Sequence, residues 1–337
     1  MGEWTVSVRE ARRMIHPDLS NVLILPGVQR TAPDSRSLAR AVERGSLIKL
    51  RRGAYVERGT WEGLDARARH LVRVDAAVSA AKERPTFSGM SAAAIWGVPI
   101  LGEFPNYVTV LDRWKGGGRS EPGVRRTAAG QRTAHIEQVD GYAVTNLART
   151  AIDVAFATPF TQAVGSVDWC IHRKNSKATS KEPLAQELRT FEGRRGIKLA
   201  RSVVAFASPL SDSFGESQCR AVIHLMGFAA PQLQVEFHDS QGTMAVDFYW
   251  PAVRVAAEFD GKQKYTVAEY TGDHPEEVVW REKKRQDRLL RQIAGVERLI
   301  TADVSNPARL VAILSDAGIP RSVRHGVPRG GAPHGGR

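Results

Sequence analysis

The sequence has very few cysteines and no long apolar stretch. Its two cysteines, Cys170 and Cys219, lie far apart and lack metal-ligand spacing, which argues against a disulfide framework or a zinc ribbon and fits a reducing compartment. No apolar run is long enough to span a membrane, and the N-terminal segment has no apolar core of signal-peptide type. We therefore expect a cytoplasmic protein with no membrane partner.

No repeat of solenoid length is visible in the 337 residues. The composition, 42% hydrophobic and 25% charged, is typical of globular proteins and excludes a wholly disordered chain. A chain of this length favours two or three domains over a single one.

Acidic residues are outnumbered, with 36 Asp and Glu against 48 Lys and Arg and a formal net charge of +12. Each Lys or Arg that meets a phosphate releases condensed counterions, so this imbalance favours a nucleic acid as the partner. Chains from GC-rich genomes are also rich in arginine, which leaves an incidental origin of the charge open.

One segment near the N-terminus, PDSRSLARAVERGSLIKLRRGAYV, has a clear pattern. Asp34 or Ser35 can cap a helix with one apolar face, and Gly45 can end it. The residues that follow predict a short β-hairpin with Arg51 and Arg52 at its turn. A helix followed by a basic hairpin is typical of a winged helix, whose wing lies near a phosphate backbone. The alternative is a helix and hairpin with solvated arginines.

The same segment resembles the N-terminal winged helix of AbiEi-type antitoxins, over roughly residues 5–60. The stretches SGMSAAAIWGVP and VTNLARTAIDVA resemble the body of that family and fall in a predicted mixed α/β middle domain, residues 61–205. The resemblance implies a DNA-binding domain at residues 1–60 and a cognate toxin as a protein partner. It carries no catalytic role.

Residues 206–318 predict a third domain with the element order α-β-β-β-α-β. Ser211, Asp212 or Ser213 can cap the first helix, SFGESQCRAVIHLMG. The tail, residues 319–337, is rich in Pro, Gly and Arg and is predicted to be disordered.

Acidic residues interrupt two apolar strands of this domain. Asp247 lies within AVDFYW, and Glu258 and Asp260 lie within RVAAEFDG. Carboxylates in central strands are costly to bury without a positive partner, and Mg²⁺ is bound by a few carboxylates plus waters. Glu216, in the preceding helix, could reach the same ion through a water.

A structural alternative needs no metal. Glu258 and Asp260 could form a surface ion network, and Asp247 could bond backbone amides. Exposed ion pairs stabilise a fold by only about 0–1 kcal/mol, so such a network would not imply a function. The cations within reach in the sequence are Lys262, Lys264, Arg281 and Arg285.

Taken in order, GES, VDF, EFDGKQKY and EKKRQD resemble the PD-(D/E)xK nucleases, and most closely the domain related to the very-short-patch-repair endonuclease. The resemblance implies hydrolysis of phosphodiesters with Mg²⁺ or Mn²⁺ as cofactor and Asp247 and Glu258 as metal ligands. The implied catalytic set is Glu216, Asp247, Glu258, Asp260 and Lys264.

The chain departs from the family pattern at one position. In the family a lysine stands two residues after the second acid, which here is Glu258, and this chain has Asp260 in its place. A lysine there would orient the attacking water and neutralise charge. Lys264 or Lys262 has the reach to supply that amine, and Lys283 or Arg285 from the next helix could do so instead.

Together these patterns predict an α/β (α+β) fold: a winged helix, a mixed middle domain and a restriction-endonuclease-like domain. The expected function is a metal-dependent DNA endonuclease. A noncatalytic DNA-binding antitoxin or autorepressor of a toxin–antitoxin system is the first alternative, and an accessory subunit that binds another protein is the second. The expected DNA-contacting residues are Arg51, Arg52, Lys262, Lys283 and Arg285.

Overall fold

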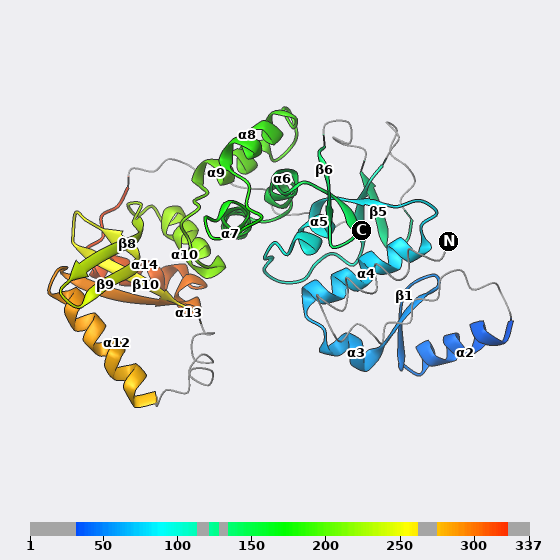
Figure 1. Ribbon diagram of the computed structural model, residues 1–337, viewed down its shortest axis with the longest axis horizontal. Helices are drawn as coiled ribbons and strands as arrows, with labels where there is room; N and C mark the ends of the chain where they lie inside the picture. Colours follow the sequence, from blue (N-terminus) through cyan, green and yellow to red (C-terminus); the bar gives the residue numbers. More distant parts are fainter. Residues whose placement is uncertain (1–31, 113–120, 128–133, 262–274, 323–337) are drawn as a thin grey trace. The chain divides into compact units, whose positions relative to one another are not determined.

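The computed structural model describes residues 32–112, 121–127, 134–261 and 275–322, with only the backbone at 32–35 and 275–279 (Figure 1). Its helices and strands form an α+β fold, which confirms the predicted class. In the described ranges, no helix is both long and apolar enough to cross a membrane.

Contacts group the chain into two compact units, Met1–Ala157 with Glu182–Gly193, and Thr158–Lys181 with Arg194–Arg337. The grouping places two helices, Phe160–Ile171 and Ile197–Phe206, with the C-terminal sheet, although the sequence had assigned both to a middle domain ending at residue 205.

The described part of the first unit starts with the predicted helix and hairpin. Its elements are α2 (Ala32–Glu43), β1 (Leu47–Arg51), β2 (Ala54–Glu57) and α3 (Arg58–Gly63). Gly45, at φ +75°, ends the turn after α2 in a left-handed conformation that suits glycine. The predicted cap at Asp34 or Ser35 is wrong, because both residues lie inside α2.

A five-stranded sheet follows, in the order β5-β4-β3-β7-β6. Its strands are β3 (Thr86–Phe87), β4 (Val108–Leu111), β5 (Val124–Thr127), β6 (Ile136–Val139) and β7 (Tyr142–Thr145). The accompanying helices are α4 (Ala66–Ala80), α5 (Gly89–Trp96), α6 (Leu147–Ala157) and α8 (Lys181–Arg189).

Two local predictions fare differently here. The sequence VTNLARTAIDVA predicts a helix capped by Thr145 or Asn146. Asn146 caps α6, since its Oδ1 accepts a hydrogen bond from the Arg149 amide at 2.9 Å. The sequence from Arg113 to Arg126 is rich in glycine and arginine and predicts a basic loop. This prediction is wrong at its end, because Val124 already belongs to β5, which pairs in parallel with β4. Tertiary pairing thus overrides a segment with weak strand propensity.

The second unit carries a four-stranded sheet in the order β11-β10-β9-β8. Its strands are β8 (Gln232–Asp239), β9 (Gly242–Trp250), β10 (Val255–Asp260) and β11 (Gly295–Ile300). Its helices are α7 (Phe160–Ile171), α9 (Ile197–Phe206), α10 (Phe214–Leu225), α12 (Pro275–Leu290), α13 (Thr301–Val304) and α14 (Pro307–Asp316). The described elements from α10 to β11 follow the order α-β-β-β-α-β that the sequence predicted.

Each face of this sheet has its own apolar core. Phe248, Val255 and Ala257 belong to the core that contains residues of α10 and α14, which we call the α10 core. Ala256 packs with Leu289 of α12 in a second cluster, the α12 core. This alternation along β10 is that of a strand covered on both faces.

Candidate functional site

The hairpin of β8 and β9 changes faces at one point. The register pairs Leu233 with Phe248 and Val235 with Val246, so Gln234 and Asp247 lie opposite each other. Leu233 and Phe248 pack in the α10 core, whereas Val235 and Val246 pack in the α12 core. Residues two apart in a regular strand share a face. Here they do not, and Gln234, at φ +50°, has the left-handed backbone that turns the strand.

The start of α10 holds Glu216 in a fixed orientation. Ser213 caps the helix, with its Oγ accepting from the Glu216 amide at 3.1 Å and donating to Glu216 Oε1 at 2.9 Å. The Asp212 amide donates to Glu216 Oε2 at 2.9 Å. Gly215 permits close packing of this turn, because a Cβ there would lie 2.2 Å from the Phe259 ring. The predicted cap is therefore confirmed at Ser213.

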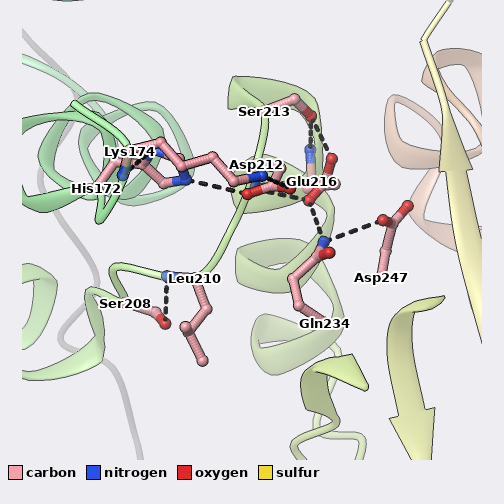
Figure 2. Close-up of polar contacts among 9 residues, drawn as sticks. All are labelled: His172, Lys174, Ser208, Leu210, Asp212, Ser213, Glu216, Gln234 and Asp247. Carbon is pink, nitrogen blue, oxygen red and sulfur yellow. Dashed lines mark hydrogen bonds and ion pairs between the residues drawn. The ribbon is translucent and has the colours of Figure 1, made fainter. Parts of the chain in front are cut away.

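Glu216 and Asp247 converge on one amide group (Figure 2). Gln234 Nε2 donates to Glu216 Oε2 and to Asp247 Oδ1, each at 3.1 Å. The other oxygen of Asp247 accepts from the Phe259 amide at 2.8 Å. Glu216 is only 8% exposed, and burial together with the Asp247 carboxylate raises the pKa of Glu216 to about 7. Two of the predicted acids thus share one site.

Asp212 connects this pair to the chain after α7. Its carboxylate accepts from Lys174 Nζ at 2.6 Å and lies 3.1 Å from His172 Nε2, as Figure 2 shows. Although partial burial opposes the change, the hydrogen bonds from Lys174 and His172 lower the pKa of Asp212. These contacts fix the backbone whose amide bonds Glu216.

Glu258 pairs with an arginine of α12. Its Oε1 lies 2.6 Å from Nη2 of Arg285 on α12, and Arg285 also reaches Glu282 at 3.3 Å. The same Nη2 donates to the Ala245 carbonyl at 2.6 Å. Of the ion network that the sequence left open as the alternative, the pair of Glu258 with Arg285 is present. The structure therefore does not bring Glu258 to the amide that joins Glu216 and Asp247.

The remaining predicted site residues are placed only in part. Asp260 ends β10, and its buried Oδ1 has no hydrogen-bond partner within the described part of the chain. Lys283 is exposed on α12, while Lys262 and Lys264 lie outside the described residues. Within the described ranges, no three His, Cys, Asp or Glu residues are grouped to hold a metal ion. The Mg²⁺ or Mn²⁺ site stays a prediction.

The two hairpin arginines have different surroundings. Arg51 Nη2 lies 3.5 Å from Glu121, and the Arg51 side chain is 16% exposed. Arg52, at the turn itself, is exposed. Of the two predicted DNA contacts, Arg52 is the one whose side chain is open to solvent.

The sequence interpretation missed Gln234. The register of the hairpin could have identified it. A turn at Ser240 and Gln241 pairs Asp239 with Gly242, and the same register, continued along both strands, places Gln234 opposite Asp247. The change of face at Gln234 could not be predicted from the sequence, because glutamine is not a residue type that favours a left-handed backbone.

Comparison with known proteins adds relatives but no activity. No family model matches the chain. Two uncharacterized proteins of Mycobacterium tuberculosis, MT2308 of strain CDC 1551 / Oshkosh and Rv2248 of strain ATCC 25618 / H37Rv, are each 32% identical over 200 residues, covering 57% of this chain and 70% of each relative. The chain belongs to their family. Both relatives are uncharacterized proteins, so they supply no activity for this chain.

Proposed function

We propose that the chain is a metal-dependent DNA endonuclease in which Glu216 and Asp247 hold the divalent cation. The observation that carries the proposal is the convergence of their carboxylates on Gln234 Nε2, each at 3.1 Å. Mg²⁺ is commonly held by one or two carboxylates, with waters and substrate phosphates completing its shell. The donor set of hard oxygens, brought together in a largely buried place, fits such an ion.

The surrounding residues orient the two acids. Ser213 and the Asp212 amide fix both oxygens of Glu216, and the Phe259 amide fixes one oxygen of Asp247. When bound, Mg²⁺ or Mn²⁺ would supply an activated water and neutralise charge on the phosphate. Lys264 remains the proposed source of the amine that the family pattern places beside the second acid.

Duplex binding is assigned in this proposal to the basic surfaces. Arg52 on the hairpin and Lys283 on α12 are both exposed, and the chain carries a net charge of +12. Phosphate contacts of this kind position a protein on DNA without reading its sequence. The cytoplasm is the proposed location of the reaction.

A nicking assay on supercoiled plasmid with Mg²⁺ or Mn²⁺ tests the proposal. We expect Asp247→Asn and Glu216→Gln to lower the nicking rate by at least ~100-fold, because each removes a cation ligand. Their DNA affinity should stay close to that of the unmodified chain. Glu236→Gln, an exposed acid on β8, is the matched control and should nick normally. Cleavage that survives both substitutions would exclude the assignment.

A second candidate is a DNA-binding antitoxin or autorepressor that does not cut. The observation in its favour is the ion pair of Glu258 with Arg285 at 2.6 Å, which commits one acid of the family pattern to a structural role. This function predicts DNA binding without cleavage in either metal, and binding that Asp247→Asn leaves unchanged.

A further inference from the structure

Gln234 is more than a neighbour of the two acids. We propose that its amide nitrogen holds Glu216 and Asp247 together in the arrangement of Figure 2, and that its amide oxygen is a third protein ligand when a divalent cation enters. The inference rests on the proposed function of the acid pair and names a residue that the family pattern did not supply.

The hydrogen bonds fix which end of the amide faces the acids. Nε2 lies 3.1 Å from Glu216 Oε2 and 3.1 Å from Asp247 Oδ1. The opposite orientation would set Oε1 against two carboxylate oxygens and leave no donor between them. The nitrogen therefore occupies the place between the carboxylates, so a cation that binds both must displace it.

Displacement does not require the side chain to leave. Rotation about the last side-chain bond of glutamine exchanges its nitrogen and oxygen, and amide oxygens are among the ligands that divalent cations accept. One residue can thus serve as a donor to two carboxylates and as a ligand beside them. A lysine or arginine at the same position could serve only as the donor.

The backbone supports a purpose for this side chain. Gln234 has φ +50°, a conformation that costs a residue with a Cβ about 1–2 kcal/mol. Glycine would adopt it more easily, yet the position carries a long amide. Strain of this kind is characteristic of functional sites, where the surrounding structure holds it in place. Paired residues lie on either side, at Leu233 and Val235.

Binding of Mn²⁺ to the full chain, followed by electron paramagnetic resonance of the free ion, tests the assignment without activity. We expect Gln234→Met, which keeps the length and loses the amide, to weaken binding about 10- to 100-fold. Gln234→Glu retains an oxygen ligand and should bind Mn²⁺ at least as tightly as the unmodified chain. Gln232→Met, at an exposed position on the same strand, should bind normally.

Two results would overturn the inference. Unchanged affinity in Gln234→Met would remove any role toward the cation, and equal weakening in Gln234→Glu would show that the oxygen is not a ligand. Gln234→Gly, which relieves the left-handed backbone and lacks the side chain, repeats the first comparison if Gln234→Met does not fold. A thermal melt in EDTA checks folding of every variant.

The same samples separate this inference from the nuclease assignment. Mn²⁺ binding that depends on Gln234 in a chain that does not nick plasmid would support the ligand role and reject the nuclease. Nicking by the unmodified chain with normal Mn²⁺ affinity in Gln234→Met would do the reverse. Absence of Mn²⁺ binding by the unmodified chain would overturn both.

Discussion

Arg285 on α12 forms an ion pair of 2.6 Å with Glu258 on β10, and the two side chains are 29% and 17% exposed. The same guanidinium nitrogen donates to the Ala245 carbonyl of β9. One side chain thus ties α12 to two neighbouring strands. Its removal would leave a largely buried carboxylate without this partner.

We therefore expect Arg285→Met to lower the free energy of unfolding by about 1–3 kcal/mol, the range for hydrogen bonds that involve a charged group. Urea denaturation measures the change. Arg291→Met, at an exposed position just after α12, is the control and should change stability by less than about 0.5 kcal/mol. Equal stability of the two variants would contradict the structural role of this pair.

Arg52 and Arg51 offer a paired test of DNA binding by the hairpin. Arg52 is exposed, whereas Arg51 lies 3.5 Å from Glu121, which already compensates its charge. Arg52→Ala should weaken DNA binding and lower the slope of log affinity against log salt by ~0.9, the value for one phosphate contact. Arg51→Ala should change this slope less. Fluorescence anisotropy over a KCl series measures both, and slopes equal to that of the unmodified chain would exclude the hairpin from the interface.

Gly215 sets how closely α10 approaches β10. Alanine is the better helix former by about 1 kcal/mol, but its Cβ would lie 2.2 Å from the Phe259 ring, which belongs to the α10 core. We expect Gly215→Ala to destabilise the chain by ~1–3 kcal/mol, the usual cost of overpacking a core. Gly63→Ala, in α3 with no atom within 4 Å of the new Cβ, should be neutral or stabilising in the same thermal melts. If Gly215→Ala leaves the stability unchanged, the Phe259 ring moves to make room for the added Cβ and this prediction is wrong.

His70 makes the stability of the first unit depend on pH. Its ring is buried and bonds the Pro105 carbonyl at 3.1 Å and Ser91 Oγ at 2.9 Å. Burial is the main cause that lowers the pKa of His70 from 6.5 to about 4. Below pH ~6.5 the unfolded chain takes up a proton that the folded chain refuses, so this stability is complete above pH ~6.5 and is lost as the pH falls toward 4.

The loss from this residue is on the order of 3 kcal/mol over that interval. Urea denaturation at several pH values measures it. His70→Gln, which does not titrate, should be less stable at neutral pH but should lose less stability between pH 6.5 and 4.5. If the unmodified chain and His70→Gln lose the same free energy of unfolding as the pH falls, the claim that His70 stays neutral in the folded chain is wrong.

Local signals account for the predictions that the structure confirms. Ser213 and Asn146 cap their helices, and each of these hydrogen bonds closes within three residues. The order α-β-β-β-α-β follows from apolar periodicity, which depends on neighbouring residues alone. Where the contact is local, the residue types are enough to predict it.

One wrong prediction and one question that the sequence left open both lie where distant contacts decide. The end of the predicted basic loop, residues 124–126, instead belongs to β5, because this segment pairs with β4. Glu258 could have met Asp247 or the cations of α12, and the packing of α12 beside β10 gives it Arg285. The spacing of residues along the chain predicts neither the pairing of β5 with β4 nor the ion pair of Glu258 with Arg285.

The sequence by itself determined the chemical character of this protein: its basic charge, the order of its elements and the acids that interrupt apolar strands. The tertiary structure alone decided which of those acids meet. Glu216 and Asp247 meet at Gln234 Nε2, where the β8–β9 hairpin passes from one apolar core to the other and Gln234 has a left-handed backbone. The alternation of residues in a strand predicts which side chains share a face only while the backbone stays extended, and at Gln234 the backbone is left-handed.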